Sequence, residues 1–318
     1  MTPHTLITGG LGLVGKALTT RLLAEECTVR VSTRQNCLSN EPHLTYIHTA
    51  DLSSATDWST ALECIDSVIH CAARVHVMHE TEINPLVVFR AVNVDGTLNL
   101  ARQAAAAGVK RFIFISSIKV NGECTQPGRA FSELDIPNPQ DAYGLSKQEA
   151  EAGLRQIAAD SGMDVVIIRP PLVYGPGVKA NFAALMHAVQ RGWPLPLGAV
   201  KNQRSLVALD NLVDFIVTCV SHPQAANQTF LVSDGHDQST TELVLGLAHA
   251  AGVSARLLPV PVWVLQAGAA LIGKGDAVQR LCGNLQLDIS KAGQLLGWIP
   301  PMSVEEGLHR TFTRMGNS

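Results

Sequence analysis

The sequence predicts an α/β fold in which a doubly wound parallel sheet carries helices on both faces. Short runs of β-branched and apolar residues alternate with helical patterns through the first half of the chain, and a glycine cluster directly follows the first run. Alternation of this kind produces right-handed βαβ units and a parallel sheet. The predicted strands are 5–8, 28–32, 45–48, 67–70, 111–116 and 165–169, and the predicted helices include 12–24, 86–107 and 143–159.

The glycine cluster after the first strand predicts a dinucleotide site. Residues 10–15 read GLGLVG and match G-x-G-x-x-G. Such glycines allow a tight turn, close approach of backbone N–H groups to a pyrophosphate, and close packing of helix on strand. The following helix N-terminus favours the bound anion. A purely structural turn is the alternative. The residues assigned here to the cofactor are Gly9, Gly12, Leu13, Val14 and Gly15.

The second strand bears on which dinucleotide binds. Enzymes that use NAD usually place Asp or Glu about 20 residues after the glycines, where it binds the ribose 2′-hydroxyl. Residues 29–35 read VRVSTRQ and contain no acid, whereas Ser32, Thr33 and Arg34 could bind a 2′-phosphate. The sequence therefore favours NADP(H), with NAD(H) possible. The alternative is that Arg34 is a solvated loop cation.

The residues after the next two strands extend this cofactor site. Asp51, with Leu52 beside it, follows the third strand and could hold the adenine amino group; a helix cap is the alternative for Asp51. Cys71, Ala72 and Ala73 follow the fourth strand and are small enough to let the cofactor pass.

Composition and charge argue against several other classes of protein. The chain has 318 residues, a formal net charge of −3 and 16% charged residues, without a dense run of Lys or Arg. These values argue against disorder and disfavour a nucleic-acid partner. Seven cysteines without a CxxC pair indicate free thiols and a reducing, cytoplasmic location. The eleven histidines show no metal-ligand spacing, so no catalytic metal is expected.

The longest apolar run, at 257–273, reads LLPVPVWVLQAGAALIG. It is shorter than the roughly 20 apolar residues that a membrane-spanning helix needs, and two prolines and a glutamine interrupt it. We expect a buried helix here and no membrane insertion.

A loop rich in proline and glycine, RPPLVYGPG at 169–177, ends the strand–helix alternation. The remaining chain is mostly helical, with short strands. We therefore predict a dinucleotide-binding domain at 1–170, to which about 205–232 returns. The remaining segments, 171–204 and 233–318, are predicted to form a smaller, mostly helical lobe.

The segment YGLSK places Tyr143 and Lys147 four residues apart, on one face of a helix. A tyrosine hydroxyl titrates near pH 10, and a nearby ammonium or a positively charged nicotinamide lowers that pKa. The pair can therefore exchange a proton with an alcohol or ketone. Ser116 and Ser117 end the fifth strand, at the edge where open α/β sheets bind ligands, and Ser117 could hold the reacting oxygen.

Together, the TGGxGxxG turn, the serine ending the fifth strand and the Y-x-x-x-K pair resemble the extended short-chain dehydrogenase/reductases, which share a Rossmann domain. NVDGT (93–97), RPPLVYGPG and DISKAGQLLGW (288–298) are similar to the nucleotide-sugar epimerase/dehydratase branch. FISSIKVNGE (114–123) and RPPLVYGPGVKANF (169–182) resemble a bacterial O-antigen subgroup. That subgroup includes proteins labelled UDP-glucose 4-epimerase and UDP-N-acetylquinovosamine dehydrogenases.

The resemblance implies roles for individual residues. Ser117, Tyr143 and Lys147 would form the catalytic triad, and Tyr143 and Lys147 would also contact the cofactor. Asn93 and Pro170 would belong to the cofactor site.

The resemblance also implies a substrate and a partner. The second lobe would bind a UDP-sugar through Asn181, Arg204 and Arg280, together with Ser117; a surface salt bridge is the alternative for Arg280. The helices at 86–107 and 143–159 would pair across a homodimer.

Two departures from the family pattern narrow the chemistry. The 4,6-dehydratases carry Asp-Glu directly after the catalytic Ser or Thr, whereas this chain has Ile118 and Lys119, so we do not expect dehydration. Asn121 replaces a usual Tyr, and the sequence offers no account of it.

Three functional hypotheses follow. The first is a 4-keto reductase that uses NADPH to reduce a UDP-4-keto-6-deoxy-N-acetylhexosamine for surface polysaccharide. The second is a UDP-glucose or UDP-N-acetylglucosamine 4-epimerase with tightly bound NAD. The third, a dinucleotide sensor without catalysis, is disfavoured by the intact triad.

Overall fold

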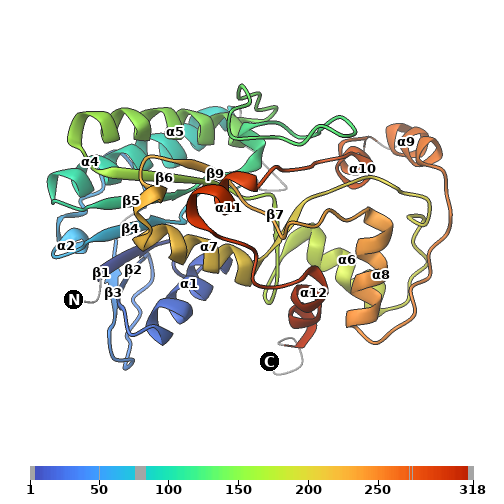
Figure 1. Cartoon of the computed structure of the whole chain (residues 1–318), viewed down its shortest axis with the longest axis horizontal. Coiled ribbons are helices and arrows are strands. Elements are labelled where there is room, and N and C mark those ends of the chain that lie inside the picture. The colour runs from blue at the N-terminus through green and yellow to red at the C-terminus, as the bar shows by residue number, and fades with distance from the viewer. Residues whose placement is uncertain (1–3, 50, 76–83, 272, 274, 314–318) are drawn as a thin grey trace.

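A seven-stranded, entirely parallel sheet forms the centre of the molecule (Figure 1). The computed structural model describes residues 4–49, 51–75, 84–271, 273 and 275–313. The strand order is β3-β2-β1-β4-β5-β6-β9. The strands are β1 (His4–Thr8), β2 (Thr28–Thr33), β3 (Leu44–His48), β4 (Ser67–His70), β5 (Arg111–Ile115), β6 (Asp164–Arg169) and β9 (Thr229–Leu231). The six predicted strands end within one residue of the observed ones.

Helices cover both faces of this sheet, which confirms the predicted fold class (Figure 1). On one face, α1 (Leu13–Ala24) and α7 (Leu209–Ser221) pack on a core that includes Ile7. On the other face, α4 (Thr97–Ala106) and α5 (Ala142–Ser161) pack on a core that includes Leu6. Successive strand residues alternate between the two cores, as the pleat of a strand requires.

The predicted helix at 86–107 is interrupted by a π-helical turn. It consists of α3 (Pro85–Arg90), the π-helix η1 (Ala91–Gly96) and α4. A Cβ at Gly96 would lie 2.6 Å from Leu52 Cγ, so glycine permits the close contact with the loop after β3. The π turn changes which side chains face inward, and it carries Asn93 into the interior.

The C-terminal part of the chain builds a second, smaller layer around its own core. A parallel pair, β7 (Leu172–Tyr174) and β8 (Leu206–Ala208), lies beside it. Phe182, Leu247 and Leu308 are buried in this core. The helices of this part are α6 (Ala180–Gln190), α8 (Thr240–Ala250), α9 (Val262–Leu271), α10 (Gly275–Cys282) and α12 (Val304–Thr313).

Four short helices complete the fold. They are α2 (Ser59–Leu62), α11 (Ser290–Leu296), and the 3-10 turns η2 (Ile118–Val120) and η3 (Pro223–Ala225).

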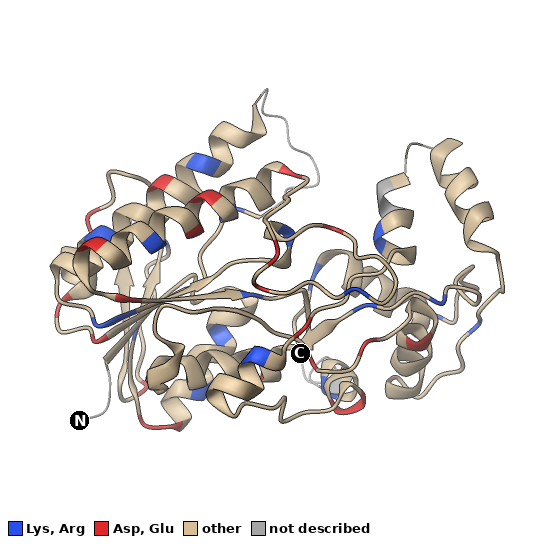
Figure 2. Cartoon of the chain, turned by 45° about the horizontal axis from the view of Figure 1, so that its top comes forward, with Lys and Arg blue, Asp and Glu red and all other residues tan. Residues whose placement is uncertain are grey.

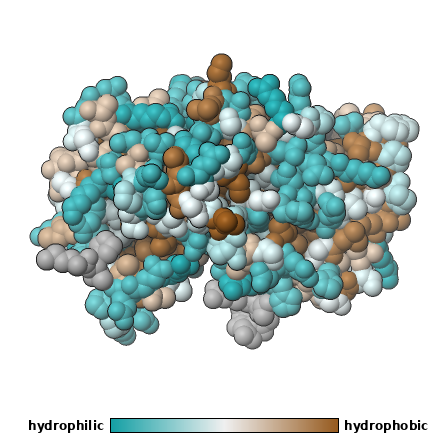
Figure 3. All heavy atoms as spheres, in the orientation of Figure 1, coloured by the Kyte–Doolittle hydropathy of each residue, from teal (hydrophilic) through white to brown (hydrophobic). Residues whose placement is uncertain are grey.

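The prediction of a buried helix at 257–273 is wrong. Within α9 only Ala269 is buried, whereas Trp263 is 71% and Leu271 89% exposed. Figure 2 shows α9 as an uncharged helix at one end of the molecule, and apolar surface is visible at that end in Figure 3. Apolar residues on every side of a helix leave no 3.6-residue period that separates an inner from an outer face. Within the described part of the chain, no helix combines the length and the apolar character needed to cross a membrane.

Candidate functional site

The turn between β1 and α1 is built so that only glycine fits at two positions. Gly9 has φ +69°, and a Cβ there would lie 2.7 Å from the backbone nitrogen of Ala72. A Cβ on Gly15 would lie 2.4 Å from the carbonyl oxygen of Gly9. Gly12 caps α1 without a side-chain hydrogen bond. Gly9, Leu11 and Gly12 line a cavity beside the N-terminus of α1, and a helix N-terminus is the kind of position that binds a phosphate.

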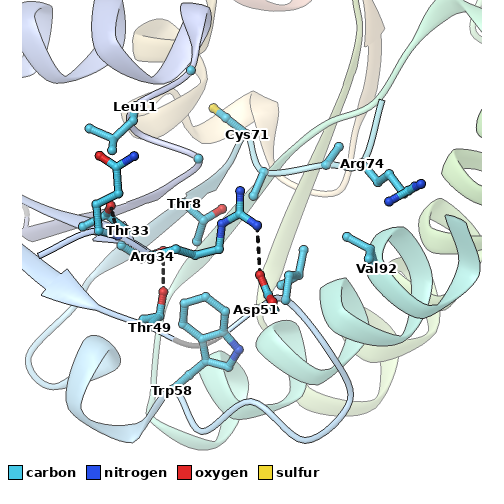
Figure 4. Close-up of a pocket in the computed structure, with 17 residues that line it drawn as sticks. Thr8, Leu11, Thr33, Arg34, Thr49, Asp51, Trp58, Cys71, Arg74 and Val92 are labelled. Atoms are coloured by element: carbon cyan, nitrogen blue, oxygen red, sulfur yellow. Dashed lines mark hydrogen bonds and ion pairs between the residues drawn. The ribbon is translucent and has the colours of Figure 1, made fainter. Parts of the chain in front are cut away.

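This cavity has a volume of about 690 Å³ and lies along the carboxyl ends of β1, β2, β3 and β4 (Figure 4). That size suits a cofactor-sized ligand. Predicted cofactor residues that line it are Gly9, Gly12, Thr33, Arg34, Asp51, Leu52, Cys71, Ala72 and Ala73. Ser32, expected beside Thr33 at a 2′-phosphate, also lines it. Lining residues that the sequence reasoning missed are Thr8, Leu11, Gln35, Thr49, Trp58, Arg74 and Val92. Thr8 and Thr49 adjoin strand ends, which is the signal that could have found them.

At one end of the cavity, Arg34 and Asp51 point toward one another (Figure 4). Their Nη1 and Oδ1 atoms are 2.9 Å apart, and the side chains are 77% and 80% exposed. Asp51 is therefore the partner of Arg34 and caps no helix. Residues 29–35 have no acid, yet the fold supplies a carboxylate beside Arg34 from the segment after β3.

The predicted catalytic residues come from η2 and α5, at the carboxyl edge of the sheet. The Oγ of Ser117 caps η2, accepting from the backbone N–H of Lys119 at 3.2 Å. Tyr143 and Lys147 lie one turn apart on α5, whose N-cap Asp141 accepts from the backbone N–H of Gly144 at 2.7 Å.

Burial controls the ionisation of both residues on α5. It lowers the pKa of Lys147 to about 7, while the charge of Glu151 opposes that change. The Lys147 ammonium lies 4.0 Å from the centre of the Phe114 ring. Burial also raises the pKa of Tyr143 to about 12, and the charge of Asp141 adds to the increase. The sequence led us to expect a lowered pKa for Tyr143, whereas in the chain by itself the loss of hydration and the charge of Asp141 raise it.

Asn93 connects the cavity wall to the catalytic helix. Its side chain accepts from the backbone N–H of Arg74 at 2.8 Å and donates to the carbonyl of Arg74 and to Ser146 Oγ, both at 3.0 Å. It is buried and is absent from the cavity lining. Leu13, Val14 and Gly15 likewise lie behind the lining, in α1.

A buried charged network, which the sequence reasoning missed, lies beneath the site. Arg169 donates to both oxygens of Glu151, at 2.9 and 2.6 Å, and to Asn121 Oδ1 at 2.8 Å. Ser116 donates to Glu151 at 2.6 Å. Ser116 is therefore engaged in the interior, while Ser117 stays at the sheet edge. Glu151 lies four residues after Lys147, and that spacing, with a lone arginine ending an apolar strand, is the signal that could have found the network.

The two family departures have structural partners. Asn121 accepts from Arg169 and donates to the carbonyl of Ser132 at 2.7 Å, which accounts for an amide at this position. The Lys119 ammonium pairs with Glu123 Oε1 at 2.9 Å and closely with Asp141.

Apart from Ser117, the residues predicted to contact substrate lie in the C-terminal part, away from the lining of the 690 Å³ cavity. Asn181 is exposed in α6, and Arg280 is exposed in α10. Arg204 donates to the carbonyl of Gly283 at 2.9 Å, at the end of α10. Pro170 is buried, and its carbonyl accepts from the N–H of Ile118 at 3.0 Å.

In the part of the chain that the structure describes, no group of three His, Cys, Asp or Glu residues is placed to hold a metal ion. The fully buried His70 is a core residue: it is hydrogen-bonded to Thr8 Oγ1 at 2.6 Å and Thr97 Oγ1 at 2.9 Å. Burial lowers its pKa to about 3, so it stays neutral.

Known protein families and sequences include matches to this chain over most of its length. Residues 5–233 match the model of the NAD dependent epimerase/dehydratase family. The chain is 50% identical to a UDP-glucose 4-epimerase of Vibrio cholerae over 312 residues, covering 98% of this chain and 95% of that protein. It is 27% identical to the N-acetyl-alpha-D-glucosaminyl-diphospho-ditrans,octacis-undecaprenol 4-epimerase of Escherichia coli O157:H7, covering 98% and 95% of the two chains.

Solved structures share the fold over the whole chain. A UDP-glucuronic acid 4-epimerase from Bacillus cereus in complex with NAD has a TM-score of 0.79 at 21% identity, covering 98% of each chain. A UDP-glucose 4-epimerase from Thermotoga maritima with UDP-glucose has a TM-score of 0.77 at 23% identity, covering 99% of this chain and 100% of that chain.

Proposed function

The chain belongs to the NAD dependent epimerase/dehydratase family, and from this premise we propose that it is a UDP-sugar 4-epimerase that keeps NAD bound during turnover. The observation that carries the proposal is the 50% identity to the Vibrio cholerae protein over 98% of this chain. The 4-keto reductase that the sequence favoured receives less support from the comparisons.

The residues around the β1–α1 turn fit NAD. A Cβ at Gly9 or Gly15 would collide with backbone atoms, so these glycines let the turn close tightly, and the cavity beside Gly9 and Gly12 extends past the ends of four strands. Asp51 beside Arg34 weakens the attraction of that cation for a 2′-phosphate, which favours NAD over NADP. In this proposal the cofactor site consists of Gly9, Gly12, Leu13, Val14, Gly15, Thr33, Arg34, Asp51, Leu52, Cys71, Ala72, Ala73, Asn93, Tyr143, Lys147 and Pro170.

The chain's own residues then perform the proton chemistry. When bound, NAD supplies a hydride acceptor and donor for C4 of the sugar. Ser117 holds the C4 oxygen by a hydrogen bond, and Tyr143 takes the proton of the C4 hydroxyl and later returns it. Lys147 binds the nicotinamide ribose, and its charge, with that of the oxidised ring, counters the burial that raises the pKa of Tyr143.

The division of labour in the proposal follows the predicted lobes. Residues 1–170 with about 205–232 bind the cofactor, and 171–204 with 233–318 bind the UDP-sugar, with Asn181, Arg204 and Arg280 at its diphosphate.

Two copies pair through the outer layer of α3, α4 and α5, giving a homodimer. Light scattering at micromolar concentration tests the pairing, and a monomer would contradict it.

The first experiment measures the bound nucleotide and the turnover together. Purified protein is denatured and the released nucleotide is quantified; native protein is incubated with UDP-glucose and with UDP-N-acetylglucosamine, without added cofactor. We expect about one NAD per chain and conversion to the C4 epimer. The Tyr143→Phe variant, which keeps the ring but lacks the hydroxyl, is the matched control and should retain NAD without turnover.

The absence of an acid in residues 29–35 favours a second candidate, the 4-keto reductase. Its test mixes the protein with a UDP-4-keto-6-deoxy-N-acetylhexosamine and NADPH or NADH. Stoichiometric loss of the reduced nicotinamide band, with no epimerisation in the first experiment, would replace the epimerase proposal by this one.

A further inference from the structure

Lys119 joins the two segments that carry the proposed catalytic hydroxyls. It is the second residue of η2, two positions after Ser117. Its backbone N–H donates to Ser117 Oγ at 3.2 Å. Its partly buried ammonium reaches across to Asp141, the N-cap of the helix that carries Tyr143. One side chain thus ties the serine turn to the start of the tyrosine helix.

Asp141 both caps α5 and places a negative charge near Tyr143, and its pairing with Lys119 bears on both effects. Its Oδ1 accepts from the N–H of Gly144 at 2.7 Å and so caps α5, while its Oδ2 faces the Lys119 ammonium. It also lies two residues before Tyr143, and its negative charge adds to the burial that raises the pKa of that phenol. A carboxylate needed for the helix cap therefore opposes formation of the phenolate.

Charged and titratable groups lie on α5 and its cap, and also on η2, on α3 and in the segment after β4, which lie near that helix. The Phe89 ring packs edge-on against the Tyr143 ring, 6.1 Å between centres, and Arg74 lies 6.0 Å from the centre of Phe89. The groups are Asp141, Lys147 and Glu149 on α5 and its cap, Lys119 and Glu123 on η2 and the next loop, Cys71 and Arg74 after β4, and Arg90 on α3, paired with Glu149.

Near the start of α5, one cation faces two carboxylates. The Lys119 ammonium pairs with both Glu123 and Asp141. One positive and two negative side chains give this group a net charge of −1. Without the ammonium the same group would carry −2, next to a phenol that must become an anion. An acid at position 119 would bring it to −3.

We propose that Lys119 is a positioning residue for the reaction: its ammonium neutralises Asp141, so that the helix cap does not oppose the phenolate of Tyr143, and it holds the Ser117 turn against that helix. The inference rests on the proposed function, in which Tyr143 takes the proton of the C4 hydroxyl. It also gives a role to the residue that stands where the resembling dehydratases have Glu.

Four variants test these charges, and the measurement is the pH dependence of kcat/KM. Lys119→Met changes the local charge from −1 to −2, and we expect the limb of the pH profile that reports the ionisation of Tyr143 to move about one pH unit higher. Asp141→Asn keeps a good helix cap, changes the charge to 0, and should move the limb lower. The double variant returns the charge to −1 and should restore the wild-type limb, as should Lys119→Arg. Lys110→Met, which removes an exposed lysine paired with Asp66, is the control.

The outcomes separate charge from structure. A loss of kcat in Lys119→Met with an unmoved limb, or a double variant that shifts further than either single one, would overturn the proposal. If Lys119→Met does not fold, Asp141→Asn alone still decides, because an unmoved limb in that variant would contradict the charge argument.

The inference about Lys119 can still be tested if the proposed function proves wrong. If no UDP-sugar is epimerised, Tyr143 can be titrated by tyrosinate absorbance, with the Tyr143→Phe variant subtracted, since the chain has only three tyrosines. The same order of pKa values is expected: Asp141→Asn lowest, wild type and double variant together, Lys119→Met highest. Any other order would overturn the inference about Lys119.

Discussion

Glu151 and Arg169 form a doubly hydrogen-bonded ion pair in the interior, with Nε–Oε1 and Nη2–Oε2 distances of 2.9 and 2.6 Å. The two side chains are 1% and 2% exposed, so water stabilises neither charge. The pair joins α5 to the last residue of β6, one helical turn after Lys147. It thereby fixes the rotation of the helix that carries Tyr143 and Lys147.

Removing one partner of this pair should be strongly destabilising. Glu151→Ala leaves the Arg169 guanidinium buried without its counter-charge, and we expect a loss of about 3–5 kcal/mol in the free energy of unfolding. Urea denaturation measures the change. Arg155→Ala, which removes the half-exposed partner of the same carboxylate at 2.9 Å, is the control and should lose at most about 1 kcal/mol. Similar losses in the two variants would contradict the prediction.

The Arg34–Asp51 pair should set the preference between the two dinucleotides. Asp51→Asn frees the guanidinium for a 2′-phosphate, and we expect the ratio of NADPH to NADH affinity to rise about tenfold, equivalent to about 1.4 kcal/mol. Arg34→Asp should lower the same ratio. Fluorescence titration of protein freed of nucleotide measures both affinities, and an unchanged ratio in both variants would show that the pair has no part in the selection.

The close contact at Gly15 should make its replacement costly. A Cβ in Gly15→Ala would lie 2.4 Å from Gly9 O, so the turn must open, and we expect a loss of about 1–3 kcal/mol in stability and a fall in NAD content. Thermal unfolding and quantification of released nucleotide measure the two effects. Gly268→Ala, in α9 with open space around its Cβ position, should lose neither.

His70 should make the protein less stable in acid. Burial lowers its pKa to about 3 from an ordinary 6.5, so between these values the unfolded chain binds a proton that the folded chain does not. The free energy of unfolding should therefore fall as the pH drops through this window, by about one kcal/mol per pH unit from this group. Urea titrations at several pH values should show a shallower decline in His70→Gln, and an identical decline would assign the effect to other groups.

The strands could be predicted from sequence because each buried strand is a short β-branched or apolar run with a glycine, helix or turn signal beyond it. The π turn at Ala91–Gly96 could not, since its residues fit the flanking helical pattern and no local signal marks the extra residue of the π turn. β9 has three residues, too few for a pattern. The exposure of α9 was missed because an apolar run reveals composition but not which neighbours cover it.

The part of the site that the sequence reveals is the part carried by local spacing. The glycine turn and the Tyr143–Lys147 pair each lie within a few residues of chain. The Arg34–Asp51 pair bridges 17 positions and the Glu151–Arg169 pair 18, and both depend on which elements lie side by side in the fold. The sequence did not predict the raised pKa of Tyr143 for a related reason, because the degree of burial is a property of the packed interior.

The path of the chain between its two layers has a consequence for how such an enzyme can be altered. The chain leaves the main sheet after β6, forms β7 and α6, returns through β8 and α7 to β9, leaves again for α8, and packs once more on the main-sheet core at α11 before it reaches α12. A graft of the whole C-terminal layer from another protein would need five splice junctions, one of them between the hydrogen-bonded strands β7 and β8. Engineering a different sugar preference is therefore better attempted by substituting single side chains in place than by recombining gene segments.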